Sequence, residues 1–172
     1  QVCAATKTCI PGRQLEDDGT VMMQLSNGAQ GLLWASQICI GESQGLSLRI
    51  YGDKGSLSWK LERPAELWHH GLDGTSQLLR AGGTQRGIQA TSATWLPSGL
   101  PEGYLEALSN IYRAFAENLE RLIDDSEPKP SRFHPTIDDG VRSVSFIDAV
   151  VRNIMPENEE KWTGLESANQ AL

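Results

Sequence analysis

The sequence contains neither of the glycine-rich loops that hold nucleotide phosphates. Its 17 glycines form no Gly-x-Gly-x-x-Gly run and no Gly-x-x-x-x-Gly-Lys-Ser/Thr run, so no site for a dinucleotide or a nucleoside triphosphate can be placed. No apolar run approaches the roughly 20 residues that are needed to span a bilayer. These absences exclude a self-contained nucleotide-binding enzyme and a membrane-spanning protein.

Basic charge and cysteine are also scarce. The chain has 15 Lys and Arg residues against 22 Asp and Glu residues, a net charge of −7, which argues against binding to nucleic acid or to an anionic membrane. The cysteines Cys3, Cys9 and Cys39 are odd in number and lack metal-ligand spacing. We therefore expect reduced, buried structural thiols in a cytoplasmic protein.

The length and composition are those of a globular domain. The 172 residues suit one domain with its own core, and the 39% hydrophobic and 22% charged residues are ordinary for a soluble protein. The chain begins at Gln1, and neither a charged nor an apolar leader region follows. From this we expect the chain to be part of a longer or processed protein.

Alternating residues predict that the first two-thirds of the chain is made of strands. Residues 21–26 have a period of two, and Asn27-Gly28 then indicates a hairpin because both residues tolerate positive φ. Gly52-Asp53-Lys54-Gly55 indicates a second hairpin. Successive hairpins predict a mainly antiparallel sheet, with strands at 2–8, 21–26, 32–38, 46–51, 57–59, 66–70 and 77–80.

The last third, after a loop-rich linker at 82–101, has the period of helices. The first predicted helix ends at Asp124-Asp125, before Pro128 and Pro130. The second begins near Thr136, which has the spacing of an N-cap with Asp139, and ends at Pro156. The apolar faces that we expect to pack are Tyr104, Leu108, Ile111, Phe115, Leu119 and Leu122, and then Ile137, Val141, Val144, Ile147, Val151 and Ile154.

Strands followed by two amphipathic helices predict an α+β fold. We expect an open-faced, mainly antiparallel (mixed) β-sheet with helices packed on one face, formed by residues 1–165 and followed by a polar tail at 166–172. The uncovered face of such a sheet is available to a second subunit, another domain or a ligand.

No group of residues forms a catalytic or metal-binding set by pattern alone. His69-His70 invites a metal interpretation, but neighbouring strand residues point to opposite faces and cannot chelate one ion together. We therefore favour two surface or interface histidines on an edge strand. Paired carboxylates could suggest hydrolysis. Their positions explain these pairs better. Asp17-Asp18 lies in a loop, Asp124-Asp125 ends a helix and Asp138-Asp139 begins one.

Several polar or aromatic side chains near strand ends could recognise a polyhydroxy ligand through their donors and acceptors. They are Ser36, Gln37, Glu42, Glu62 and Trp95. Ordinary surface, or an interface between subunits, is the alternative that pattern leaves open. We take Ser36, Gln37, Glu42 and Trp95 as the candidate substrate-facing residues.

Four successive segments of the sequence resemble the C-terminal domain of the Gfo/Idh/MocA oxidoreductases, the relatives of glucose–fructose oxidoreductase and inositol dehydrogenase. They are 25–37, 45–59, 96–107 and 139–142, the third with the run Pro97-Ser98-Gly99-Leu100-Pro101-Glu102-Gly103-Tyr104. The resemblance covers the chain up to about residue 165. Leu100 stands where close relatives tend to have His, a change expected to alter specificity or to leave the site less polar.

The resemblance implies a two-domain enzyme. An N-terminal Rossmann domain, absent from this chain, would bind NAD or NADP, and the family's catalytic Lys and His precede the part that matches, so no catalytic or cofactor-binding residue is carried over. The parent protein is expected to oxidise a sugar, polyol or inositol hydroxyl by removal of its proton with hydride transfer to nicotinamide. This chain would position the substrate and build a homo-oligomer through the sheet face, and by itself it would bind no NAD(P) and be inactive.

Two other functions stay open. The same two-domain fold serves a non-catalytic sugar-sensing regulator, and fold alone does not decide between them. A Lys-Pro motif and a catalytic His upstream would favour the enzyme, and their loss would favour the regulator. A stand-alone oligomerisation module is the third possibility, and it predicts a dimer without a ligand.

Overall fold

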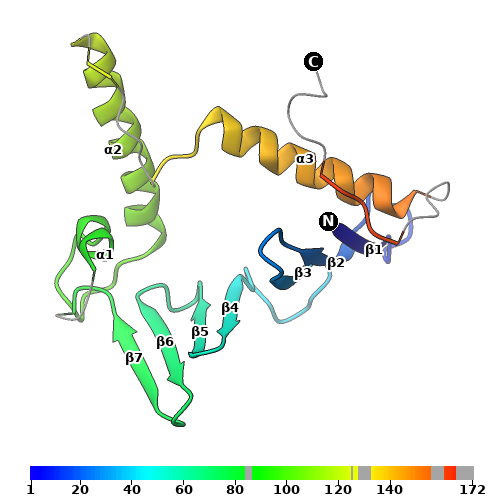
Figure 1. The fold of residues 1–172 in the computed structure, drawn as a ribbon, viewed down its shortest axis with the longest axis horizontal. Helices are drawn as coiled ribbons and strands as arrows, with labels where there is room; N and C mark the ends of the chain where they lie inside the picture. Colours follow the sequence, from blue (N-terminus) through cyan, green and yellow to red (C-terminus); the bar gives the residue numbers. More distant parts are fainter. Residues whose placement is uncertain (84–86, 125, 128–132, 156–160, 166–172) are drawn as a thin grey trace. The chain divides into compact units, whose positions relative to one another are not determined.

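The chain divides into two compact units in the computed structural model, which describes residues 1–83, 87–124, 126–127, 133–155 and 161–165 (Figure 1). Unit 1 lies within residues 1–41 and 135–172, and unit 2 within residues 42–134. The tail expected at 166–172 and the prolines expected to follow the first helix, at 128 and 130, lie outside the described residues.

Unit 1 is built on a three-stranded antiparallel sheet with β2 in the middle. Its strands are β1 (Val2–Lys7), β2 (Asp18–Gln24) and β3 (Gln30–Ser36). The hairpin predicted at Asn27-Gly28 is confirmed. Gly28 has a φ of +86°, and Asn27 Oδ1 accepts a hydrogen bond from the Ala29 N–H at 3.0 Å.

Helix α3 (Ile137–Ile154) contacts β1 and completes unit 1. Its predicted N-cap is confirmed, because the Thr136 N–H donates to Asp139 Oδ2 at 2.9 Å and Thr136 Oγ1 accepts from the Asp139 N–H at 3.4 Å. The core consists of Val2, Val21 and Ala149, flanked by the partly buried Ala4, Met23, Phe146 and Val150.

The face of α3 that packs on the sheet is not the one that the apolar repeat predicted. The stripe from Ile137 to Val151 stays exposed, with Val144 and Ile147 each 59% exposed. Phe146, Ala149 and Val150 face the core instead, and Ala149 is fully buried. Alanine brings the helix backbone close to the sheet, which the larger residues of the predicted stripe would prevent.

The two ends of the described chain meet at β1. Val2 and Thr163 exchange two backbone hydrogen bonds, of 2.8 and 2.9 Å. From α3, Asn153 Oδ1 accepts from the Ala4 N–H at 2.6 Å, and its Nδ2 donates to Thr163 Oγ1 at 3.1 Å. One amide side chain thus joins the strand, the helix and the C-terminal segment.

A buried carboxylate organises the loop between β1 and β2. Asp17 is only 3% exposed, and its oxygens accept from the backbone N–H groups of Cys9 at 2.7 Å and Ile10 at 3.0 Å. Arg13 Nη1 lies 3.4 Å from Asp17 Oδ2. The backbone hydrogen bond from Cys9, followed by that from Ile10 and the charge of Arg13, holds the pKa of Asp17 below its usual range.

The expectation of buried thiols is wrong. Cys9 is exposed, and Cys3 and Cys39 are half-buried, although all three are free of disulfides. Cys9 lies on the loop held by Asp17, where the chain turns over the surface. Loss of hydration, together with the Asp17 carboxylate, raises the pKa of the Cys9 thiol, which makes it a weak nucleophile.

Unit 2 contains a four-stranded antiparallel sheet in sequential order. Its strands are β4 (Ser47–Gly52), β5 (Gly55–Lys60), β6 (Glu66–Gly71) and β7 (Ser76–Arg80). Two helices follow, α1 (Ile88–Ala93) and α2 (Tyr104–Ile123). The α+β class is confirmed, and every described strand pair, in the three-stranded and in the four-stranded sheet, is antiparallel.

Helix α1 lies in the segment that was expected to be a loop. It is short, and its residues include Thr and Ser, which weaken the periodic signal of a helix. Helix α2 ends before Asp124 as predicted, yet its apolar stripe is largely exposed, with Tyr104 69% and Phe115 57% exposed. The residues of α2 that are buried are Asn110 and Ala114.

The two adjacent histidines lie on β6, which pairs with both β5 and β7, so the expectation of an edge strand is wrong. The His70 ring stacks parallel to Trp68 at 6.2 Å, and its Nδ1 lies 2.8 Å from Ser76 Oγ.

Across the part of the chain that the structure describes, no three His, Cys, Asp or Glu residues are grouped as metal ligands. None of the described helices has the length and apolar character to cross a membrane.

We expect Asp17→Asn to lower the free energy of unfolding at neutral pH, because the amide replaces one of the two accepting oxygens by a donor. A depressed carboxylate pKa stabilises the fold above the unfolded value of about 3.9, and this contribution is lost as pH falls through the folded pKa. Urea unfolding should therefore show a difference from wild type at pH 6 that shrinks below about pH 4. Glu16→Gln, which removes a neighbouring exposed charge, should show no such difference, and an equal effect of both variants would contradict the assignment.

We expect Gly55→Ala to destabilise unit 2, whereas Gly52→Ala in the same hairpin should be tolerated. Gly55 has a φ of +150°, and a Cβ there would overlap the His70 carbonyl group of the paired strand. A Cβ at Gly52 would meet only the Gly55 oxygen at an ordinary 3.7 Å. Thermal unfolding should show a loss of about 1 kcal/mol or more for Gly55→Ala, and equal stabilities of the two variants would refute this account.

Candidate functional site

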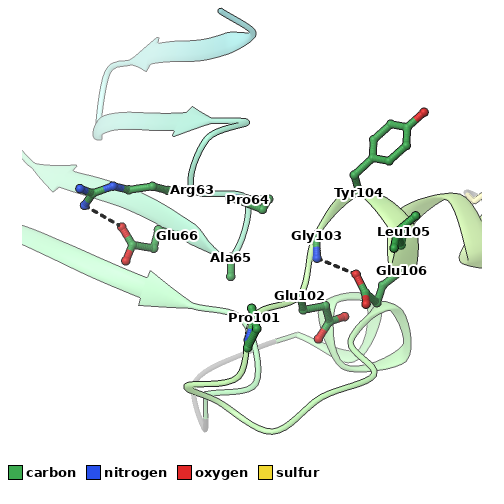
Figure 2. Close-up of a pocket in the computed structure, with 10 residues that line it drawn as sticks. All are labelled: Arg63, Pro64, Ala65, Glu66, Pro101, Glu102, Gly103, Tyr104, Leu105 and Glu106. Atoms are coloured by element: carbon green, nitrogen blue, oxygen red, sulfur yellow. Dashed lines mark hydrogen bonds and ion pairs between the residues drawn. The ribbon is translucent and has the colours of Figure 1, made fainter. Parts of the chain in front are cut away.

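A shallow pocket of about 550 Å³ lies in unit 2, where the turn after β5 approaches the start of α2 (Figure 2). Figure 2 shows Pro64 and Ala65 facing Pro101 and Gly103 across it. The pocket is lined by residues from two segments: Arg63, Pro64, Ala65 and Glu66, and Pro101, Glu102, Gly103, Tyr104, Leu105 and Glu106.

Close packing of Pro64 on Gly103 brings the two segments together. A Cβ at Gly103 would lie 2.6 Å from Pro64 Cγ, so the approach needs a residue without a side chain. The Pro64 carbonyl is fixed in turn, because it accepts a hydrogen bond from the Trp59 indole N–H at 2.9 Å. The sheet thereby determines where the segment before α2 lies.

The carboxylates around the pocket are already engaged. Glu106 Oε2 accepts from the Gly103 N–H at 2.8 Å, and this backbone hydrogen bond lowers the pKa of Glu106. The Glu66 oxygens lie 3.6 Å from Arg63 Nη1 and 3.5 Å from Arg80 Nη2. A carboxylate with a lowered pKa, such as that of Glu106, suits binding better than it suits proton transfer near neutral pH.

Glu102 connects the pocket to the segment that carries Trp95. Its Oε1 accepts from the Trp95 N–H at 2.9 Å, and its Oε2 accepts from the Leu96 N–H at 3.0 Å. Two consecutive backbone donors are therefore held by one carboxylate, an arrangement that fixes the direction of the chain at this point.

Helix α2 supplies the other contacts to this segment. Asn110, only 5% exposed, accepts from the Trp95 indole N–H through Oδ1 at 2.8 Å and donates to the Ala93 carbonyl at 2.7 Å. The Arg113 guanidinium lies 5.2 Å from the centre of the Trp95 ring, and its Nη2 donates to the Ser92 carbonyl at 2.9 Å. Trp95 itself is 51% exposed.

The four predicted substrate-facing residues are divided between the two units. Ser36 ends β3, where its Oγ accepts from the Ile38 N–H at 3.4 Å, and the next residue, Gln37, donates its backbone N–H to the Asp17 carbonyl at 2.8 Å. In unit 2, Glu42 is exposed in the loop before β4, and Trp95 lies before α2. Their role in binding substrate stays a prediction.

Sequence analysis missed three residues of this site, namely Glu102, Asn110 and Arg113. Glu102 belongs to the run that carries the family resemblance, so that motif was the available signal. Asn110 lies one position before Ile111 and outside the apolar stripe, so the helical pattern did not mark it. Its burial depends on contacts with residues 93 and 95, which no helical period can show.

A second hollow, of about 330 Å³, lies on one face of the unit 2 sheet. Strand pairing places Arg49, Ser58 and Trp68 side by side across three strands of this face. Ser47, Lys60, Arg63 and Glu66 complete its lining with Trp59. Trp68 on this face is 40% exposed.

Comparisons with known proteins agree with the fold. Residues 1–58 match the model of the GFO/IDH/MocA C-terminal domain. An uncharacterized oxidoreductase of Bacillus subtilis, YfiI, is 32% identical over 140 residues, which are 81% of this chain and 36% of that protein. An oxidoreductase structure from Sinorhizobium meliloti is 38% identical, with a TM-score of 0.78 over 88% of this chain and 43% of its own.

A second similar structure carries ligands. It is an inositol dehydrogenase homologue from Azotobacter vinelandii in complex with NADH and myo-inositol, 26% identical, with a TM-score of 0.78 over 88% of this chain and 41% of that one. The fold is therefore that of an oxidoreductase C-terminal domain, and the chain resembles the Gfo/Idh/MocA family, whose C-terminal domain model matches residues 1–58. It spans less than half the length of these relatives.

We expect Glu102→Gln to loosen the segment at Trp95 and Leu96, since an amide offers one accepting oxygen where the carboxylate offers two. Hydrogen exchange should become about tenfold faster at these two backbone amides. Glu120→Gln, an exposed change on α2, serves as the control. Unchanged exchange at both amides in Glu102→Gln would show that the carboxylate does not hold the segment.

Proposed function

We propose that this chain is the substrate-binding and oligomerisation domain, formed by residues 1–165, of an NAD(P)-dependent dehydrogenase acting on a sugar, polyol or inositol hydroxyl. The observation that carries the proposal is the likeness, over 88% of the chain, to the Azotobacter inositol dehydrogenase homologue in complex with NADH and myo-inositol. The domain contributes orientation of the substrate.

The described residues do not themselves fit a nicotinamide dinucleotide. Dinucleotide sites use parallel strands joined by a helix, with a glycine-rich turn at the helix N-terminus. Every described strand pair here is antiparallel, and the sequence has no such glycine fingerprint. We therefore assign NAD or NADP binding, and all bond-making steps, to an N-terminal Rossmann domain of the parent protein.

The assembly and location belong to the same proposal. The open face of the unit 2 sheet, with Arg49 and Trp68, offers polar and aromatic groups to a second copy of the protein. The three free thiols are consistent with work in the cytoplasm. Ser36, Gln37, Glu42 and Trp95 remain our substrate-facing residues.

The test uses the full-length protein that contains this chain. With NAD and NADP in parallel, we expect reduction of at least one nicotinamide by a member of a panel of sugars, polyols and inositols. Ser36→Ala, Gln37→Ala and Glu42→Ala should each raise KM by about tenfold, the effect of losing one hydrogen bond to the ligand. The exposed change Glu16→Gln should leave KM unchanged.

Two results would contradict the proposal. The first is full-length protein that binds NAD(P) but turns over nothing in the panel, which would favour a sugar-sensing regulator. The second is micromolar binding of NAD(P) to residues 1–172 alone, measured by calorimetry, since no dinucleotide site is assigned to this chain.

A further inference from the structure

Trp95 is held from three directions and still offers surface to a ligand. Glu102 fixes its backbone N–H, Asn110 fixes its indole N–H, and Arg113 covers one face of its ring at 5.2 Å. Even so, the residue is 51% exposed. A large aromatic side chain with this exposure is unusual for a position fixed by so many polar contacts.

Prior fixation favours binding through this ring. An indole that already occupies one rotamer loses little further entropy when a ligand settles on it. The π face of the indole carries partial negative charge, so it attracts the partly positive hydrogens of C–H groups. It attracts the Arg113 guanidinium on its covered side for the same reason. Since Arg113 takes one face, the opposite face is the one that a ligand can use.

The shape of that face discriminates among polyhydroxy compounds. A pyranose or cyclitol ring carries axial C–H groups that together form an apolar patch against a flat aromatic surface. An open-chain polyol has no rigid patch, and it must give up several free torsions before it could form one. A fixed aromatic plane therefore binds a cyclic polyol more tightly than an open-chain polyol with the same hydroxyls.

We propose that Trp95 is a stacking platform that selects cyclic polyols over open-chain polyols, and that Glu102 and Asn110 are the positioning residues that orient it. This inference rests on the proposed function and deepens it, because it names the shape of the substrate. Neither Glu102 nor Asn110 needs to touch the ligand, since both act through the tryptophan.

The first experiment compares ring and open-chain ligands on the full-length protein. Myo-inositol is paired with mannitol and glucose with sorbitol, and the inhibition constant replaces KM for any ligand that is not turned over. Trp95→Ala should raise KM for the ring about tenfold, the equivalent of about 1.4 kcal/mol, with kcat within about threefold. The constant for the open-chain partner should change less than about twofold.

Trp95→Phe serves as the matched variant because it keeps an aromatic face and loses the N–H that Asn110 holds. Its KM for the ring should rise no more than it does in Asn110→Ala, because both variants lose this hydrogen bond, and it should stay below that of Trp95→Ala. Two results with Trp95→Ala would overturn the stacking role. One is an unchanged KM for the cyclic ligand, and the other is an equal rise of the constants for the cyclic and the open-chain ligand.

The second experiment tests positioning. Asn110→Ala and Glu102→Gln should raise KM for the ring in the same selective way, and neither should add to the effect of Trp95→Ala in a double variant. General damage to the fold would instead raise KM or the inhibition constant for cyclic and open-chain ligands alike. It would also add to the effect of Trp95→Ala. Additive effects would therefore refute the positioning role, and Glu120→Gln on the same helix is the control.

The two levels of inference fail in different ways. A full-length protein without turnover of any panel member overturns the proposed function and this inference with it. A full-length protein that turns over a ring substrate but is indifferent to Trp95→Ala keeps the proposed function and overturns the stacking platform alone.

Discussion

The constraint on which the structure depends is the scarcity of buried apolar side chains. Only four hydrophobic residues among those described are buried, namely Val2, Val21, Ala114 and Ala149. Hydrophobic burial alone therefore contributes little to holding the individual segments in place. Polar side chains bonded to backbone groups take over much of this role in both units.

Each polar anchor works by satisfying backbone groups that a loop or a strand edge would otherwise leave unpaired. Asp17 holds two backbone donors of its loop, and Asn153 holds β1 against the C-terminal segment. Glu102 and Asn110 do the same for the segment that presents Trp95. The candidate site is thus an extension of the principle that stabilises the fold.

The exposure of the apolar stripes on α2 and α3 fits a chain that corresponds to less than half the length of the proteins it matches. Phe115 on α2 and Ile147 on α3 are each more than half exposed, in a chain that spans 43% or less of the proteins it matches. Contiguous exposed apolar surface of this kind is typical of an interface. The proposed Rossmann domain and second subunit would supply surfaces of the kind these stripes require.

Local chemistry let the sequence by itself predict the seven strands and the two long helices, although it missed α1 and placed β2 and β3 too late in the chain. Asn27-Gly28 predicts a turn because both residues accept positive φ, and Thr136 with Asp139 predicts a helix start because their bonds join neighbours in the chain. The family resemblance likewise depends on short runs of residues. On the same local grounds, the missing glycine fingerprint left no dinucleotide site to predict in this sequence.

Only the tertiary structure decided which faces pack and which side chains meet. The apolar repeat of α3 predicted the wrong face, because the sheet takes Ala149 and the repeat says nothing of how closely two backbones approach. Asn110 gave no signal, since its partners lie 15 and 17 positions earlier in the chain. Pattern reports the neighbours along a helix or strand, whereas burial and long-range hydrogen bonds exist only once distant segments are brought together.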